Sequence, residues 1–124
     1  MKKLFFIVIF LSSILMFSFP ASAEWKTVVP GEYVNIDSIK KHNGYTYFWK
    51  ISDFKKKEDG FMSFKTFYKA DCVIKKYQNL SITTYKQPMG LGQHTNIFTY
   101  DENEWKYAPP GSSLSLILDT VCKY

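Results

Sequence analysis

Side chains alternate with a period of two in residues 45–54 and again in residues 61–74, and no other feature of the sequence constrains the fold as strongly. Aromatic and β-branched residues at this period favour β-strands that bury one face. In the first strand, the two faces are formed by Tyr45, Tyr47, Trp49 and Ile51 on one side and by Thr46, Phe48, Lys50 and Ser52 on the other. In the second, one face carries Met62, Phe64, Thr66, Tyr68, Ala70 and Cys72. The alternation predicts two long strands in one sheet.

Turn signals divide the rest of the chain into short segments. Asn43-Gly44 is a dipeptide typical of a two-residue hairpin turn. Further strands are expected at residues 25–29, 32–36, 75–86 and 96–100. Between them we expect a helical turn at 37–41, turns at 55–60 and 101–104, and a loop at 87–94. Strands joined by such short connections favour an antiparallel sheet.

The period changes near the end of the sequence. Apolar residues recur there at helical spacing, namely Leu114, Ile117, Leu118, Val121 and Cys122. Ser112 or Ser113 is suited to cap the first turn of a helix. Strands followed by a single helix predict an α+β fold, an antiparallel sheet with a C-terminal helix packed on one face. The pattern does not decide which face the helix covers.

Residues 1–23 have the features of a secretory signal peptide. Lys2 and Lys3 precede an apolar run of 16 residues, and Ala21-Ser22-Ala23 follows Pro20 as a cleavage pattern. As a helix the run would span about 24 Å, which is short for a hydrocarbon core of about 30 Å. We expect a cleaved signal at 1–23 and one domain at 24–124, an uncleaved membrane anchor being the alternative. The cleavage pattern has no lipidation cysteine, so the expected product is periplasmic or secreted, with no stable membrane span.

The charge of the expected mature chain argues against nucleic acid as a partner. Its 14 lysines and 11 acidic residues leave a net charge of +3, and the sequence contains no arginine. Arginine is the residue that contacts phosphates and bases in a bidentate manner. The basic run at 55–57 is followed at once by Glu58-Asp59, which is typical of a solvated turn.

Cys72 and Cys122 are the only cysteines in the sequence. In an exported domain of this size a disulfide between them is expected, and it would join the helix to the sheet. Closing a loop of this length contributes about 4 kcal/mol by chain entropy. Free thiols or an intermolecular bridge are the alternatives.

No residue pattern in the sequence predicts catalysis or metal binding. His42 and His94 stand far apart beside turn residues, and the acidic residues at 101–104 lack the spacing of a calcium loop. The glycine-rich segment at 89–92 lacks the lysine and the strand–helix context of a phosphate loop. We therefore expect a protein that is not an enzyme, without catalytic, cofactor-binding or metal sites.

The aromatic residues are the strongest indication of a binding surface. Residues 24–124 contain 18 of them, and they lie on both faces of the strand at 45–54. One face is expected to meet the helix, and the other to meet a partner, a second subunit or solvent. The candidate binding-face aromatics are Tyr45, Tyr47, Phe48 and Trp49.

From about Trp25 to Tyr124 the sequence resembles the surface-adhesin protein E family of Gram-negative bacteria. The residues that carry the resemblance are 34–40, Trp49, 68–72, Lys76-Tyr77, Tyr85, 89–92, Trp105, 109–112 and Val121-Cys122. The resemblance implies an antiparallel sheet tied by a disulfide to a C-terminal helix, and a location outside the cytoplasm. For the founding member of the family it also implies a lipid-anchored adhesin that binds host matrix proteins and haem and forms dimers.

Three functions of different classes follow. The first is a non-enzymatic binding protein of the cell envelope that contacts a protein partner or the host matrix through an aromatic sheet face. A homodimer is one form that this protein could take. The second is a carrier of haem or another small ligand, with His42, His94 or a tyrosine as axial ligand, for which haem rests on the resemblance alone. The third is a small secreted inhibitor or hydrolase, which no placed reactive group supports.

Overall fold

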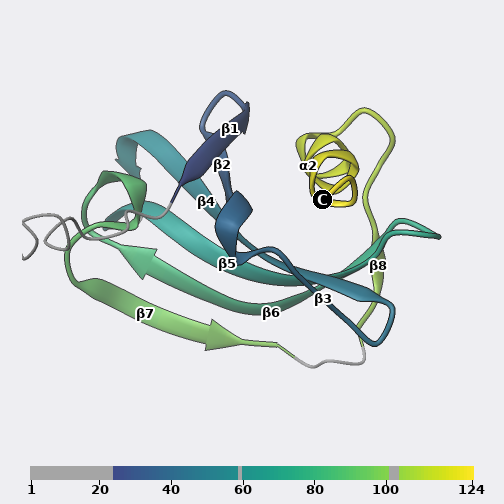
Figure 1. Ribbon diagram of the computed structural model, residues 1–124. Helices are drawn as coiled ribbons and strands as arrows, with labels where there is room; N and C mark the ends of the chain where they lie inside the picture. Colours follow the sequence, from purple (N-terminus) through teal and green to yellow (C-terminus); the bar gives the residue numbers. More distant parts are fainter. Residues whose placement is uncertain (1–23, 59, 101–103) are drawn as a thin grey trace, which may run out of the picture.

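The computed structural model describes residues 24–58, 60–100 and 104–124 (Figure 1). The predicted signal peptide at 1–23 lies outside the described residues, as does most of the predicted turn at 101–104. Within the described residues, no helix has the length and apolar character needed to cross a membrane.

The described residues form an antiparallel sheet of eight strands and one C-terminal α-helix, so the predicted α+β fold is confirmed. The strands are β1 (Trp25–Val29), β2 (Glu32–Asn35), β3 (Lys40–His42), β4 (Tyr45–Glu58), β5 (Phe61–Asp71), β6 (Lys76–Tyr85), β7 (His94–Thr99) and β8 (Lys106–Tyr107). The helices are the 3-10 turns η1 (Ile36–Ser38) and η2 (Pro88–Gly90) and the α-helix α2 (Ser113–Val121). The strand order is β1-β2-β4-β5-β6-β7, with β3 paired to β4 and β8 paired to β6.

Three strands differ from the sequence prediction, since β4 is longer than predicted and β3 and β8 were not predicted. The predicted turn at 55–60 is wrong, because β4 continues to Glu58, which pairs with Phe61 after an irregular stretch of register. Gly60 supports the tight connection with a φ of 86°. The short strand β3 was not predicted, since its three polar residues show no apolar alternation. It forms because the Asn43-Gly44 turn folds it back onto β4, pairing His42 with Tyr45.

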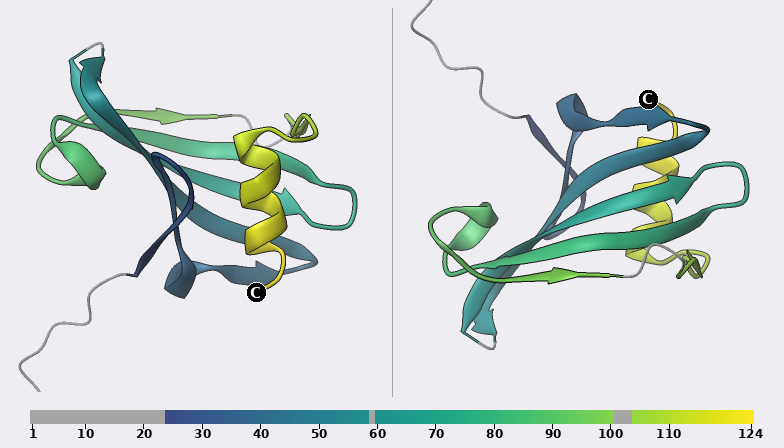
Figure 2. Two further views of the ribbon diagram at one scale, coloured as in Figure 1. Left: turned by 90° about the horizontal axis from the view of Figure 1, so that it is seen from above. Right: turned by 90° about the horizontal axis from the view of Figure 1, so that it is seen from below.

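Helix α2 packs across one face of the sheet, and no α-helix of the described residues covers the opposite face (Figure 2). Ser112 caps it, because the backbone N–H of Ser115 donates to the Ser112 Oγ at 3.2 Å. The helix buries Ile117, Leu118 and Val121 in the core. Their spacing is the apolar stripe that the sequence predicted.

The predicted disulfide between Cys72 and Cys122 is present, with 5.7 Å between the two Cα atoms. Cys122 follows the last residue of α2, and Cys72 follows the last residue of β5. The bond therefore fixes the end of the helix to the end of a central strand. The open alternatives of free thiols and an intermolecular bridge are excluded.

The helix covers the face of β4 that carries Phe48, so the placement of Phe48 on a binding face is wrong. Its side chain is fully buried and stacks on Tyr68, with 5.0 Å between the ring centroids. Val34, Ala70 and the buried side of α2 complete this core. Successive side chains of a strand point to opposite faces. Because Phe48 lies under the helix, Tyr47 and Trp49 point to the opposite face of the sheet.

A buried ion pair lies on the same face, beside the aromatic core. Lys50 Nζ is 3.3 Å from Glu32 Oε2, with only 10% of the Lys50 side chain exposed. Ser52 Oγ donates to the same carboxylate at 2.7 Å, and the Lys50 ammonium lies 5.4 Å from the ring centroid of Tyr68. Burial alone would lower the pKa of Lys50, but its interactions with Tyr68 and Glu32 outweigh it and raise the pKa. The folded protein therefore favours the charged form of Lys50.

Candidate functional site

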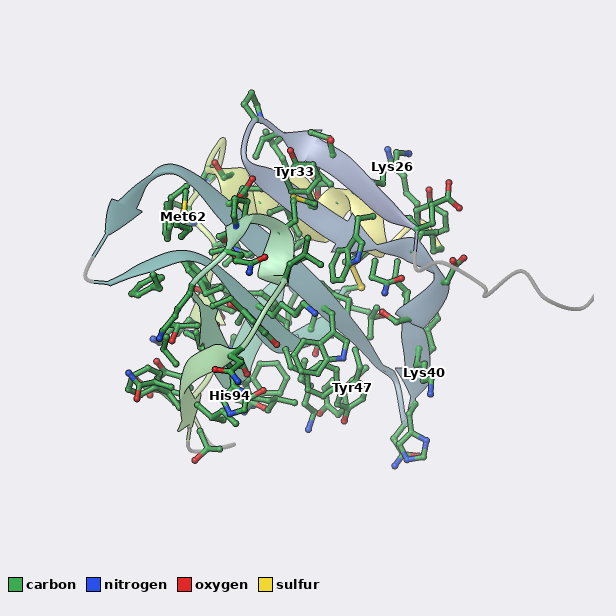
Figure 3. All side chains as sticks on the ribbon, turned by 90° about the vertical axis from the view of Figure 1, so that its left-hand side faces the viewer. Lys26, Tyr33, Lys40, Tyr47, Met62 and His94 are labelled. Atoms are coloured by element: carbon green, nitrogen blue, oxygen red, sulfur yellow. A yellow bond between two sulfur atoms is a disulfide. The ribbon has the colours of Figure 1, made fainter. Side chains whose placement is uncertain are left out.

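The candidate site lies on the sheet face that points away from α2, which we call the open face. It is formed mainly by Tyr45, Tyr47, Trp49, Lys65, Phe67, Lys69, Thr83 and Tyr85. Figure 3 shows Tyr47 on the side of the sheet away from the helix. Three of the four aromatic residues predicted for a binding face are therefore on this one surface.

The centre of the open face is a row of stacked rings. Phe67 on β5 stacks with Trp49 at a centroid distance of 4.7 Å and with Tyr47 at 6.0 Å. The pairing of Trp49 with Phe67 across the two strands explains the contact, because directly opposed residues share a face. The row gives the face a rigid apolar centre.

Two lysines flank this row, and each lies between aromatic rings. The ammonium of Lys69 is 4.4 Å from the ring centroid of Tyr45 and 5.7 Å from that of Trp105. The ammonium of Lys65 is 5.1 Å from the ring centroid of Tyr85 and 5.8 Å from that of Trp25. Among the described residues, the ion pairs are Lys50–Glu32 and Lys75–Asp119, so neither lysine of the open face has a carboxylate partner there. Their positive charges are available to a ligand.

The segment from Gln87 to Gly90 closes one end of the open face. The backbone N–H of Gly90 donates to Ser63 Oγ at 2.8 Å, and that of Met89 donates to Asp53 Oδ1 at 3.2 Å. Ser63 Oγ in turn donates to the carbonyl of Gln87 at 2.6 Å. The start of the glycine-rich segment at 89–92 is thus a structural clamp, by which we mean that its backbone is hydrogen-bonded to Asp53 on β4 and to Ser63 on β5.

A cleft of about 340 Å³ opens beside this clamp. It is lined by Trp25, Asn35, Trp49, Lys65, Thr83 and Tyr85, which come from five strands. In a flat sheet β1 and β5 would be about 14 Å apart, given a strand spacing of about 4.8 Å. The long side chains of Trp25 and Lys65 span this separation, and the Lys65 ammonium lies 5.8 Å from the Trp25 ring centroid. The cleft lies between these side chains, above β2 and β4.

Of the residues that line the cleft, only Trp49 was predicted for a binding face. Trp25, Lys65 and Tyr85 belong to three strands whose separate patterns do not show that they lie together. The alternation along a strand shows which of its residues share a face, but the order of the strands in the sheet depends on pairing between distant parts of the chain.

The two histidines do not form a joint site. His42 ends β3, where its Nε2 lies 3.1 Å from Asn43 Nδ2, and His94 begins β7. Strands β4, β5 and β6 separate β3 from β7. No group of three or more His, Cys, Asp or Glu side chains among the described residues has the arrangement of a metal site.

A second, apolar cleft of about 270 Å³ lies on the helix side of the sheet, beyond the reach of α2. It is lined by Phe61, Phe64, Ile82, Thr84, Phe98 and Tyr100. None of these described lining residues is charged, and Thr84 is the polar side chain among them apart from the Tyr100 hydroxyl, so few polar groups are placed to orient a specific ligand. The open face is the better candidate.

Comparisons with known proteins agree with this architecture. A family model described as surface-adhesin protein E matches residues 25–123. The chain is similar to the selenomethionine form of protein E from Haemophilus influenzae, with 12% identity, a TM-score of 0.66, and coverage of 84% of this chain and 91% of that one.

Two further structures give similar values. Another structure of Haemophilus influenzae protein E is 13% identical, with a TM-score of 0.66 and coverage of 84% of this chain and 89% of that one. Protein E from non-typeable Haemophilus influenzae is 13% identical, with a TM-score of 0.62 and coverage of 84% and 80%. At these identities the likeness establishes a shared fold. Among curated protein sequences, none matches the chain.

Proposed function

Because the chain belongs to the surface-adhesin protein E family, we propose that it is a non-enzymatic adhesin that acts outside the cytoplasm of a Gram-negative bacterium. The signal features of residues 1–23 support export, since they combine a basic start, an apolar run and a small-residue cleavage pattern. The ligand in this proposal is a protein of the cell envelope or of the host matrix.

The observation that carries the proposal is the composition of the open face. Protein interfaces are enriched in tyrosine and tryptophan, which supply large contact areas with little loss of side-chain entropy. Tyr47, Trp49 and Phe67 form such a centre, and Lys65 and Lys69 add charge at its borders. The charges favour a partner with an acidic contact surface.

A homodimer formed through two open faces is the competing use of the same surface. Two copies would bring Lys65 and Lys69 of one subunit toward those of the other, and like charges without counter-ions oppose such an interface. We therefore propose that the open face contacts a different protein and not a second copy of this chain.

Site-specific photo-crosslinking tests the proposal. A photoreactive phenylalanine analogue replaces Tyr47 on the open face or, as a control, Leu116, which is 45% exposed on the outer side of α2. The exported protein is then irradiated on the native envelope and on a cell-free epithelial matrix. We expect an adduct with a heterologous protein from position 47 and none from position 116. Equal labelling from both positions, or a homodimer as the sole adduct, would contradict the proposal.

A further inference from the structure

We propose that the cleft at Trp25, Trp49, Lys65 and Tyr85 binds a sugar ring that carries a carboxylate. The inference goes beyond adhesion to a protein partner, because it assigns a small-ligand subsite with its own chemistry. It does not depend on the identity of the protein that the open face contacts.

The walls of the cleft suit a saccharide. Its volume of about 340 Å³ is at the small end of the range for ligand sites, about 300 to 1,000 Å³. Trp25, Trp49 and Tyr85 supply aromatic rings whose faces are electron-rich. The C–H bonds on one side of a sugar ring carry partial positive charge, so they are attracted to such faces.

Lys65 supplies the charge that selects a carboxylate. It is the only ionisable side chain other than Tyr85 that lines the cleft, and no carboxylate of the described residues pairs with it. Gly90 leaves room for it, because a Cβ at residue 90 would overlap the Lys65 side chain. The ammonium lies between the rings of Tyr85 and Trp25, without a carboxylate to neutralise it among the described residues. The cation is therefore available to an anionic group.

Asn35 and Thr83 supply short polar groups at the same cleft. Asn35 Oδ1 is buried and has no hydrogen-bond partner among the described residues. A buried carbonyl oxygen without a hydrogen-bond donor is unfavourable. A small shift of the Asn35 side chain that lets this oxygen accept from a ligand hydroxyl is therefore favoured. A sugar hydroxyl both donates and accepts, which matches the asparagine amide and the threonine hydroxyl.

An acidic peptide is less well suited to this cleft. The strands that form its base, β4 and β5, have neighbours on both sides, so their backbone groups are already paired in the sheet. An extended peptide therefore has no strand edge to join at the base of the cleft, and edge pairing is a main source of affinity for such peptides. A ligand that lies on this base is recognised by side chains.

The three tryptophans provide a direct test, because each indole N–H gives a separate NMR signal. Trp25 and Trp49 line the cleft, whereas Trp105 lies by Tyr45 and Lys69. The ¹⁵N-labelled exported protein is titrated with methyl glucuronide, with the neutral methyl glucoside and with acetate. We expect glucuronide to shift the Trp25 and Trp49 signals in a saturable manner, with about tenfold weaker binding of glucoside, and acetate to have no effect.

Two matched variants complete the test. Lys65→Met should bring glucuronide binding down to the level of glucoside, whereas Lys76→Met, which removes a ring-flanked lysine away from the cleft and the open face, should leave it unchanged. Unchanged Trp25 and Trp49 signals with both sugars, or equal losses in the two variants, would overturn the proposal. Tighter binding of an acidic peptide at the same two tryptophans would also overturn it. Because only sugars and the purified protein are used, these results do not depend on the adhesion experiment.

Discussion

Gly90 lies directly against the side chain of Lys65, so that any larger residue at position 90 would displace the lysine. Gly90 has a φ of 64°, and its N–H is bound to Ser63 Oγ. The absence of a side chain at position 90 thus leaves the space that the Lys65 side chain occupies on the open face.

Gly90→Ala is expected to fold and to lose the position of Lys65. The left-handed backbone alone costs about 1 kcal/mol for alanine, and the overlap with Lys65 adds a displacement of that side chain. Urea unfolding and the glucuronide titration measure the two effects. Gly44→Ala is the control, because Gly44 has a φ of 81° with open space around it. If both variants bind glucuronide equally well, Gly90 does not position Lys65.

Loss of the Cys72–Cys122 disulfide should lower the unfolding free energy by about 4 kcal/mol, as expected for a loop of this length. Reduction of the wild type and the double substitution Cys72→Ala/Cys122→Ala should therefore give similar urea midpoints. Adding reductant to the double variant should change nothing further. A reduced protein with the midpoint of the oxidised one would show that the bond does not stabilise the fold.

Local periodicity predicted β4 as far as Phe54, β5 and the residues that share each of their faces from a period of two, and the C-terminal helix from helical spacing. It could not assign Phe48 and Tyr47 to inside and outside, since both faces of β4 carry aromatic residues. The helix decides the assignment, and its placement depends on packing between distant parts of the chain. The disulfide was predictable because an exported chain with two cysteines allows one intramolecular pair.

The cleft could not be predicted for a similar reason. Trp25 and Lys65 come together through the strand order β1-β2-β4-β5, which the local pattern of each strand does not specify. Strand β3 was missed because three polar residues become a strand only through the hairpin that pairs them. Local propensity is a weak guide to such short elements.

Phe48 and Tyr47 should differ sharply when replaced. Phe48→Ala removes a fully buried ring under α2 and should cost about 3 to 5 kcal/mol in unfolding free energy. Tyr47→Ala should cost much less, because Tyr47 is only partly buried on the open face. Thermal and urea unfolding of the two variants compare them directly. A larger loss from Tyr47→Ala would mean that the open face is part of the core.

The Lys50–Glu32 pair should make stability sensitive to alkaline pH. Because the pKa of Lys50 is raised above its ordinary value of 10.5, the folded protein holds this proton more tightly than the unfolded chain. The contribution of this proton to the free energy of unfolding is complete below pH 10.5, and it is lost as the pH rises through the pKa of Lys50 in the folded protein.

The variant Lys50→Met leaves Glu32 without its cation and should cost about 3 kcal/mol near neutral pH. The difference in unfolding free energy between wild type and variant should then narrow above pH 10.5. A difference that is constant across this range would show that the charge of Lys50 contributes nothing to folding.

The most direct test of the account is the equilibrium binding of the exported protein to a cell-free epithelial matrix, measured for two double variants. Tyr47→Ala/Trp49→Ala removes the centre of the open face, and Val73→Ala/Leu116→Ala removes exposed apolar side chains elsewhere. With cooperative unfolding retained in both, we expect the first to weaken binding at least about tenfold, as for the loss of central aromatic residues in an interface, and the second to bind as the wild type does. Full binding by the open-face variant would contradict the assignment of this face as the adhesive surface.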